Sequence, residues 1–204
     1  MVGNINALQK ITNRLNSTFF VLKLLVLFLT ILSFITACSN SSKSTTIKLS
    51  PKDQYLVNNP SNEVQSKVNA LMPKAIKWYG DVAKSLSHKG REFTQAEKKQ
   101  AKQLGVKNPD SVRVVILDKF PEPNKNEVNN SHAEGARAMG NIIMLKPHLK
   151  DNSTVLCHEL AHIAQKDRLG LKGFLKQLAL ELKILGYSKS SLENEAYALQ
   201  QPIL

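Results

Sequence analysis

The sequence predicts a small α+β domain that is mainly helical, with a short β-sheet or hairpin packed beside one central helix. Apolar residues recur at helical spacing over most of the chain after residue 62. Two β-branched or apolar runs, 112–117 and 142–145, interrupt that pattern and favour strands. The chain has 204 residues, of which 42% are hydrophobic, enough for one ordinary domain with accessory segments but too few for two.

The first 61 residues are expected to lie outside this domain. Residues 1–37 contain three cations, no acid and an apolar run that leads into small residues, which is typical of an export signal. The run ends Ile35-Thr36-Ala37-Cys38, which resembles a bacterial lipobox and implies a lipoprotein signal peptide over 1–37 and a lipidated, palmitate-bearing Cys38. The alternative is an ordinary transmembrane helix over 19–37. Polar residues dominate 39–61, so 38–61 is interpreted as lipid anchor and flexible tether and 62–204 as the domain.

The first half of the domain contains two expected helices. Apolar residues at helical spacing predict a helix over 64–86, which Pro73 should kink or divide. The capping box Thr94-Gln95-Ala96-Glu97 opens a second helix over 94–104, and Gly105 is placed to end it.

Two strands are expected in the middle of the chain. Residues 112–117 (VRVVIL) form a β-branched run, and 118–130 read as a loop rich in Pro, Asn and acids. The apolar run 142–145 is entered through Gly140 and Asn141 and is stopped by Pro147. We interpret it as the partner strand.

The last third of the chain is expected to be helical. Asn152 and its neighbours are good N-caps for a helix to about Leu169, with Gly170 past its end. Residues 171–185 form an amphipathic helix that closes at Gly186. A second capping box, Ser190-Ser191-Leu192-Glu193, starts a final helix at about Ser191.

The first of these helices carries His158-Glu159-Leu160-Ala161-His162. Residues four apart lie on one helix face about 5–6 Å apart, so His158 and His162 can converge on a single metal ion. Glu159 can then accept a proton from a bound water, whose pKa zinc lowers to about 7. The third ligand must come from elsewhere in the chain.

The motif and its surroundings resemble the gluzincin metallopeptidases. His158-Glu159-Leu160-Ala161-His162-Ile163-Ala164-Gln165, followed by Glu193-Asn194-Glu195-Ala196-Tyr197, is similar to small bacterial metallopeptidase domains that read HExxHxxQ and then ExEA, over roughly residues 110–200. This implies a zincin-like domain with Zn²⁺ and a downstream glutamate as third ligand. Aligning 194–196 with the family's Asn-Glu-Ala assigns Glu195, whereas Glu193, the alternative, has an expected role in the capping box. Leu199 stands where the family has a histidine-orienting aspartate, so another acceptor must substitute.

The resemblance also suggests how a substrate could bind. The strand that begins at Gly140, Asn141 and Ile142 resembles the family's edge strand, to which a peptide would add. Candidate donors to an oxyanion are Tyr187, Tyr197, His148 and His132. Cys157 points off the ligand face and is expected to pack in the core.

The expected function is a membrane-anchored zinc peptidase that hydrolyses peptide bonds in the bacterial envelope or outside the cell. We expect a monomer with a peptide or protein substrate and a domain facing the periplasm or the cell exterior. The alternative is a non-catalytic, metal-containing lipoprotein that binds anionic envelope polymers, since the net charge is +12. The lysines are dispersed without aromatic interleaving, so nucleic acid is not indicated. A zinc hydrolase that acts on other acyl bonds also stays open.

Overall fold

The computed structural model describes residues 48–122, 135–200 and 203, so the signal peptide, Cys38 and His132 lie outside the described residues. Five α-helices and four short strands make up this part of the chain, which confirms the α+β fold class. In chain order the elements are α2 (Pro51–Asn58), α3 (Asn62–Leu86), β1 (Arg91–Glu92), α4 (Gln95–Leu104), β2 (Arg113–Ile116), β3 (Ala136–Met139), β4 (Ile142–Leu145), α5 (Ser153–Ile184) and α6 (Ser191–Leu199), with short 3₁₀ turns at Pro109–Ser111, Pro147–Leu149 and Tyr187–Lys189.

The four strands form one mixed sheet in the order β1-β2-β4-β3. The two expected strands, β2 and β4, pair in parallel with Val114 opposite Ile143. β3 pairs antiparallel to β4 through the tight turn at 140–141, and β1 pairs antiparallel to β2. Every residue of β4 is buried, as expected of a central strand that is covered on both faces.

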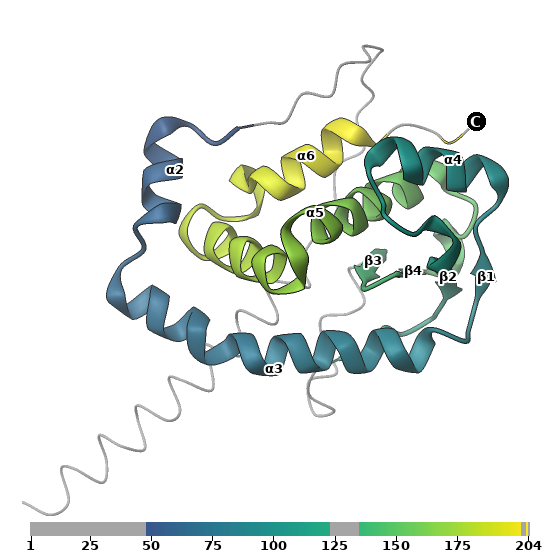
Figure 1. Ribbon diagram of the computed structural model, residues 1–204, viewed down its shortest axis with the longest axis horizontal. Helices are drawn as coiled ribbons and strands as arrows, with labels where there is room; N and C mark the ends of the chain where they lie inside the picture. The colour runs from purple at the N-terminus through teal and green to yellow at the C-terminus, as the bar shows by residue number, and fades with distance from the viewer. Residues whose placement is uncertain (1–47, 123–134, 201–202, 204) are drawn as a thin grey trace, which may run out of the picture.

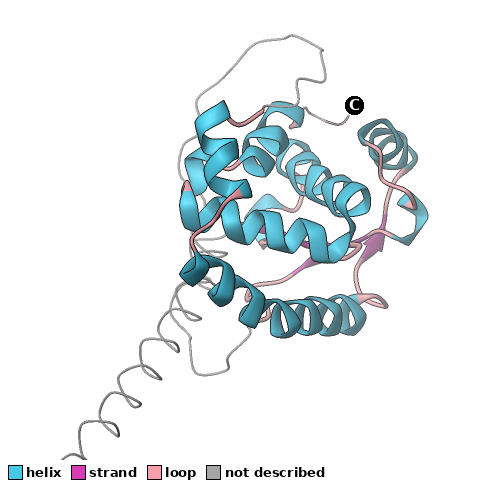
Figure 2. Cartoon of the chain, turned by 60° about the vertical axis from the view of Figure 1, so that its left-hand side comes forward, coloured by secondary structure: helices cyan, strands magenta, loops and turns pink. Residues whose placement is uncertain are grey.

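Helices cover both faces of this sheet (Figure 1, Figure 2). Alternate side chains of a strand point to opposite faces, and the two apolar clusters follow that alternation. Val115, Ile142 and Met144 pack with α3 and the second half of α5. Val114, Ile143 and Leu145 pack with α4 and the first half of α5. The first half of α5 therefore lies against the sheet.

Helix α5 is divided where the sequence places a helix end. Gly170 has φ 71° and ψ 154°, a conformation that only glycine adopts readily, and the chain is helical on both sides of it. The expected separation between a motif helix and a following amphipathic helix is thus confirmed. The second segment turns its Phe174, Leu175 and Leu178 toward α3.

Three features differ from the expectations. Helix α3 is a single element that continues through Pro73, so of the two expected effects, a kink or a division, the division does not occur. Helix α2 lies within the stretch interpreted as tether, and Val57 of α2 packs into the core. Strands β1 and β3 were not expected, because neither has the β-branched pattern of the other two. Within residues 48–122 and 135–200, no helix is long and apolar enough to cross a membrane.

Candidate metal centre

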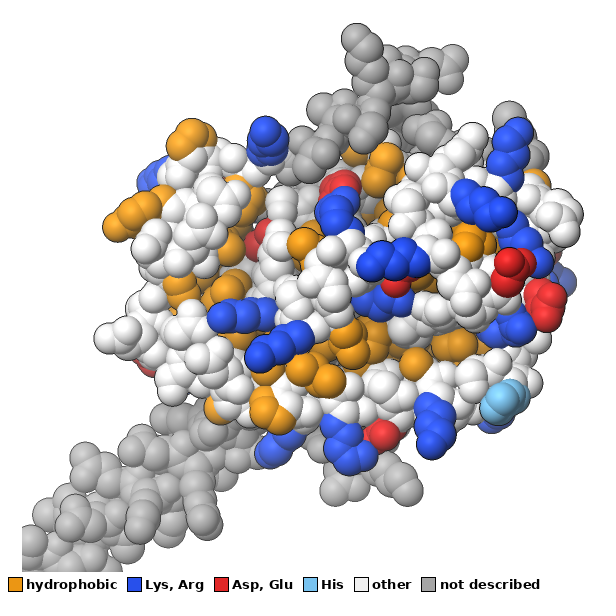
Figure 3. Space-filling view, in the orientation of Figure 1, with side chains coloured by type: hydrophobic (Ala, Val, Ile, Leu, Met, Phe, Trp, Pro, Cys, Tyr) orange, Lys and Arg blue, Asp and Glu red, His pale blue; other side chains and the backbone are white. Residues whose placement is uncertain are grey.

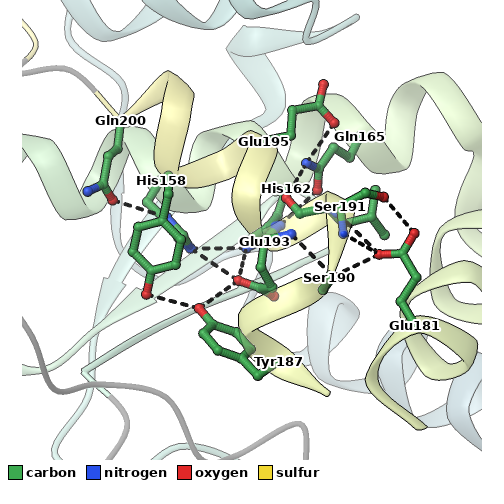
Figure 4. A network of polar contacts seen from close by, with 12 residues as sticks. His158, His162, Gln165, Glu181, Tyr187, Ser190, Ser191, Glu193, Glu195 and Gln200 are labelled. Carbon is green, nitrogen blue, oxygen red and sulfur yellow. Dashed lines mark hydrogen bonds and ion pairs between the residues drawn. The ribbon is translucent and has the colours of Figure 1, made fainter. Parts of the chain in front are cut away.

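His158 and His162 lie on one face of α5 and turn their rings toward each other (Figure 4). Their Nε2 atoms are 3.2 Å apart, and the ring planes are nearly perpendicular. Asn152 caps the helix by accepting from the N–H of Val155, which starts α5 one turn before the motif. The two imidazoles converge as their spacing predicts.

Glu193 of α6 supplies a third group at the same point. Its Oε2 lies 3.6 Å from Nε2 of each histidine. Two ligand atoms of a tetrahedral zinc ion, each about 2.0–2.1 Å from the metal, are about 3.3 Å apart. The three side chains therefore fit a zinc ion with small adjustments. Among the described residues, these three side chains are the candidate ligands for a metal ion.

Glu195, the expected third ligand, lies elsewhere. Its carboxylate forms a bidentate ion pair with the guanidinium of Arg168, at 2.8 and 2.7 Å, and accepts a hydrogen bond from Gln165. The carboxylate that the structure brings to the two histidines is that of Glu193, not that of Glu195. The alignment with the family's Asn-Glu-Ala motif points to the one of the two neighbouring glutamates whose carboxylate does not face the histidines.

Glu193 is available because another carboxylate caps its helix. Ser190 is the N-cap of α6 and accepts from the N–H of Glu193, but the reciprocal half of the expected capping box is absent at this described N-terminus. Glu181, fully buried on α5, instead accepts from the N–H groups of Ser191 and Leu192 and from the hydroxyls of Ser190 and Ser191. The side chain of Glu193 is thereby left to face the histidines (Figure 4).

Replacing Glu181 by alanine is expected to lower the free energy of unfolding by at least about 2 kcal/mol, because the N–H groups of Ser191 and Leu192 lose their acceptor and each buried donor left unpaired costs about 1–3 kcal/mol. Chemical denaturation of the metal-free chain measures this loss. Glu63→Ala is the control, since Glu63 is an exposed glutamate of α3 whose ion pair is with Lys67 one turn away, and it should change stability by less than about 0.5 kcal/mol. Equal stability of both variants would contradict the capping role.

Both histidines are held from their far side by an amide. Nδ1 of His158 lies 3.2 Å from Oε1 of Gln200, and Nδ1 of His162 lies 2.9 Å from Oε1 of Gln165. Gln200 therefore provides the acceptor that Leu199, one residue earlier, does not. Such contacts orient a metal-binding imidazole and direct its other nitrogen at the metal.

Glu159 lies between the histidines and the edge of the sheet. It is buried, and the N–H of Ala138 in β3 donates to its carboxylate. Burial raises the pKa of Glu159, which favours the protonated form, while both histidines act in the opposite direction. A carboxylate with a raised pKa next to the candidate ligands is suited to accept and return a proton.

Without a metal, His162 and Glu193 shift each other's pKa. The carboxylate of Glu193 raises the pKa of His162 to about 9, against the opposing effect of burial. In return, the two histidines hold the pKa of Glu193 well below its usual range despite burial. The metal-free site is therefore an ion pair at neutral pH, and a metal that binds there must displace a proton.

Strand β3, rather than β4, forms the edge of the sheet beside α5. Ile142 lies on β4 between two neighbouring strands and is buried, and Gly140 and Asn141 form the turn, whose oxygens accept from Lys166. The expectation that the strand beginning at 140–142 is an edge strand is therefore wrong. Four consecutive apolar residues indicate a strand buried on both faces, whereas the sequence of β3, ARAM, suits an edge.

Two tyrosines expected near the site are there. The hydroxyl of Tyr187 donates to Oε2 of Glu193 at 2.8 Å and lies 3.0 Å from the hydroxyl of Tyr197. Because a phenol has one proton, Tyr197 donates in the second bond. The ring of Tyr197 packs edge-on against His158, and this side chain is 40% exposed. Tyr187 is thus committed to Glu193, and Tyr197 is the more exposed of the two, with its proton directed at the oxygen of Tyr187.

The other candidates stand apart from this network. His148 is exposed on the 3₁₀ turn before α5. Cys157 is buried, and its thiol donates to the carbonyl oxygen of Leu199, so its expected packing role agrees with the structure. No protein-family model, no curated protein and no solved structure matches this chain.

Proposed function

We propose that this protein is a zinc-dependent peptidase, held at a bacterial membrane through a lipidated Cys38 with its domain facing the periplasm or the cell exterior. One observation carries the proposal: Nε2 of His158, Nε2 of His162 and a carboxylate oxygen of Glu193 converge at ligand spacing. The donor set of two imidazoles and one carboxylate leaves a fourth position open, as catalytic zinc sites do. The proposed ligands are therefore His158, His162 and Glu193, with Glu193 replacing Glu195.

The surrounding residues have distinct roles in this proposal. A zinc ion, when bound, would polarise the carbonyl group of the substrate and lower the pKa of a bound water molecule to about 7. Glu159 takes the proton of the attacking water and returns it to the leaving amine. Tyr197, exposed beside His158, would turn its hydroxyl from Tyr187 to donate to the developing oxyanion. Gln165 and Gln200 hold the two imidazoles.

The edge strand β3 supports a peptide as the substrate. In an antiparallel pair, only every second residue of a strand bonds to the neighbouring strand. Gly135 accepts from Lys146, so it is one of the residues that bond to β4. The main-chain groups of Ala136 and Ala138, at the alternate positions, therefore point away from β4. At Ala138 these groups already contact Glu159 and the hydroxyl of Tyr79. A substrate strand would therefore add at Ala136, two residues before Ala138, which contacts the base.

Metal content and metal removal test the proposal. The full chain, purified in detergent with zinc present, should hold one zinc ion per molecule and cleave members of a peptide library. A strong chelator should abolish cleavage, and added zinc but not magnesium should restore it, because the ligand set contains imidazoles that magnesium disfavours. A chain without stoichiometric zinc, or cleavage that survives the chelator, would contradict the proposal.

A non-catalytic role has one observation in its favour. The side chains of His158, His162 and Glu193 are only 9–12% exposed, which leaves a narrow approach to the ion. Lys and Arg side chains are spread over the face seen in Figure 3, as a binder of anionic envelope polymers would require. Stoichiometric zinc together with polymer binding, and no hydrolysis of peptides, would favour this alternative.

A further inference from the structure

Glu195 has no part in the proposed ligand set, yet it is buried at one end of a chain of contacts that reaches His162. Arg168 holds both oxygens of Glu195. Gln165, which is 1% exposed, donates from Nε2 to Oε2 of Glu195 at 3.1 Å and to the carbonyl oxygen of Leu192 at 2.8 Å. Its Oε1 lies 2.9 Å from Nδ1 of His162.

These contacts fix the orientation of the Gln165 amide. The carboxylate of Glu195, paired with a guanidinium, and the carbonyl of Leu192 can only accept hydrogen bonds. A flipped amide would turn its oxygen toward both of these acceptors in a buried space, at the cost of two hydrogen bonds. The NH₂ group therefore faces Glu195 and Leu192, and Oε1 faces His162.

The orientation of the amide determines which nitrogen of His162 carries the proton. Oε1 of Gln165 can only accept, so Nδ1 of His162 must donate. The lone pair of a neutral ring is then on Nε2, the atom that faces His158 and Glu193. Arg168, Glu195 and Gln165 thus select the tautomer that can bind a metal through Nε2.

We propose that Glu195 and Gln165 are positioning residues that hold His162 in its Nδ1–H tautomer and aim its Nε2 at the metal. The importance of this tautomer for zinc rests on the proposed function. The same Gln165 amide also binds Leu192, the residue before Glu193, so it joins one ligand to the helix that carries another. Gln200 contacts His158 alone in the described network, whereas Gln165 links both helices of the site.

Nitrogen NMR of the metal-free full chain tests the tautomer directly. In a pH series carried up to the point where the ring is neutral, the two ring nitrogens of His162 differ in chemical shift according to which of them carries the proton. The wild-type chain should show His162 protonated at Nδ1. Gln165→Leu, which keeps the volume and removes the amide, should shift the proton population toward Nε2. Nε2 protonation in the wild-type chain would overturn the proposal.

Zinc affinity gives the second readout. Gln165→Leu should bind zinc about 10–100-fold more weakly, the usual cost of removing a group that orients a ligand. Gln165→Glu should also weaken binding, because it places two carboxylates together. The exchange variant Gln165→Glu with Glu195→Gln restores a donor and an acceptor at that contact and should recover at least about tenfold of the loss. Zinc affinity unchanged in Gln165→Leu would overturn the proposal.

A matched control separates positioning from folding. Gln177 is another glutamine of α5 whose amide reaches Glu181 and Ser191 at the start of α6, without contact to His162. Gln177→Leu should lower stability but leave the His162 tautomer and zinc affinity unchanged. The wild-type chain could bind no zinc and still show protonation of His162 at Nδ1 that depends on Gln165. This result would contradict the proposed function but support the tautomer assignment.

Discussion

Glu159→Gln is expected to lower the rate of peptide hydrolysis by about 10²–10⁴-fold while zinc stays bound. Glutamine keeps the shape of the side chain and can still accept from the N–H of Ala138, but it cannot take a proton from the attacking water. The zinc-loaded variant, assayed on the best peptide of the library, measures the loss in kcat. Metal analysis of the same sample shows whether the ion is retained.

The control for this variant is Glu97→Gln. Glu97 is also buried, caps α4 and pairs with Arg91 on a different element from the candidate metal centre. Its replacement should cost stability without lowering kcat at a temperature where the protein is folded. A variant at Glu159 that loses zinc together with activity would make this residue a structural part of the site. Full activity without the carboxylate would remove it from the proposed chemistry.

Much of the fold could be predicted because its signals are local. The capping box at Thr94 and Glu97 forms with both of its hydrogen bonds, and Gly105 ends that helix in the left-handed conformation. Gly170 separates the two segments of α5 as its position in the apolar pattern indicates. Each of these features depends on residues within one or two turns, whose chemistry determines the backbone.

The remaining parts depend on contacts between distant segments. β3 and β1 become strands by pairing with β4 and β2, and their own sequences contain little β-branched pattern. Pro73 stays inside α3 because the apolar stripe on both sides of it packs on one core. Tertiary packing there outweighs a single unfavourable residue.

The candidate site shows the same division. The spacing of His158 and His162 on one helix is local, and the structure brings the two together as expected. The choice between Glu193 and Glu195 depends on Glu181, which lies ten residues before the start of α6. Glu181 caps that helix in place of Glu193. No signal near Glu193 reveals this. An acid in the preceding helix, followed by Gly186 and a serine pair, is the feature that could have indicated a competing cap.

If Glu193 rather than Glu195 is the third zinc ligand, two matched variants should differ in zinc affinity. Glu193→Gln should weaken zinc binding by more than about 100-fold, since removing a direct ligand exceeds the cost of losing an orienting group. Glu195→Gln should weaken it by less than about tenfold, because the new amide oxygen can still accept from Gln165. Competition with a zinc-sensitive dye measures both affinities on the full chain.

The comparison is informative because the two glutamates share their helix, their burial and a positively charged partner. Both lie on α6, both are buried, and each pairs with a cationic or protonated group, Arg168 for Glu195 and His162 for Glu193. Loss of folding would affect both variants and would be visible in the metal-free unfolding temperature. A larger loss of zinc affinity in Glu195→Gln than in Glu193→Gln would return the third-ligand role to Glu195 and would require α6 to turn when metal binds. The opposite result would place Glu193 in the ligand set and leave Glu195 as its support through Gln165.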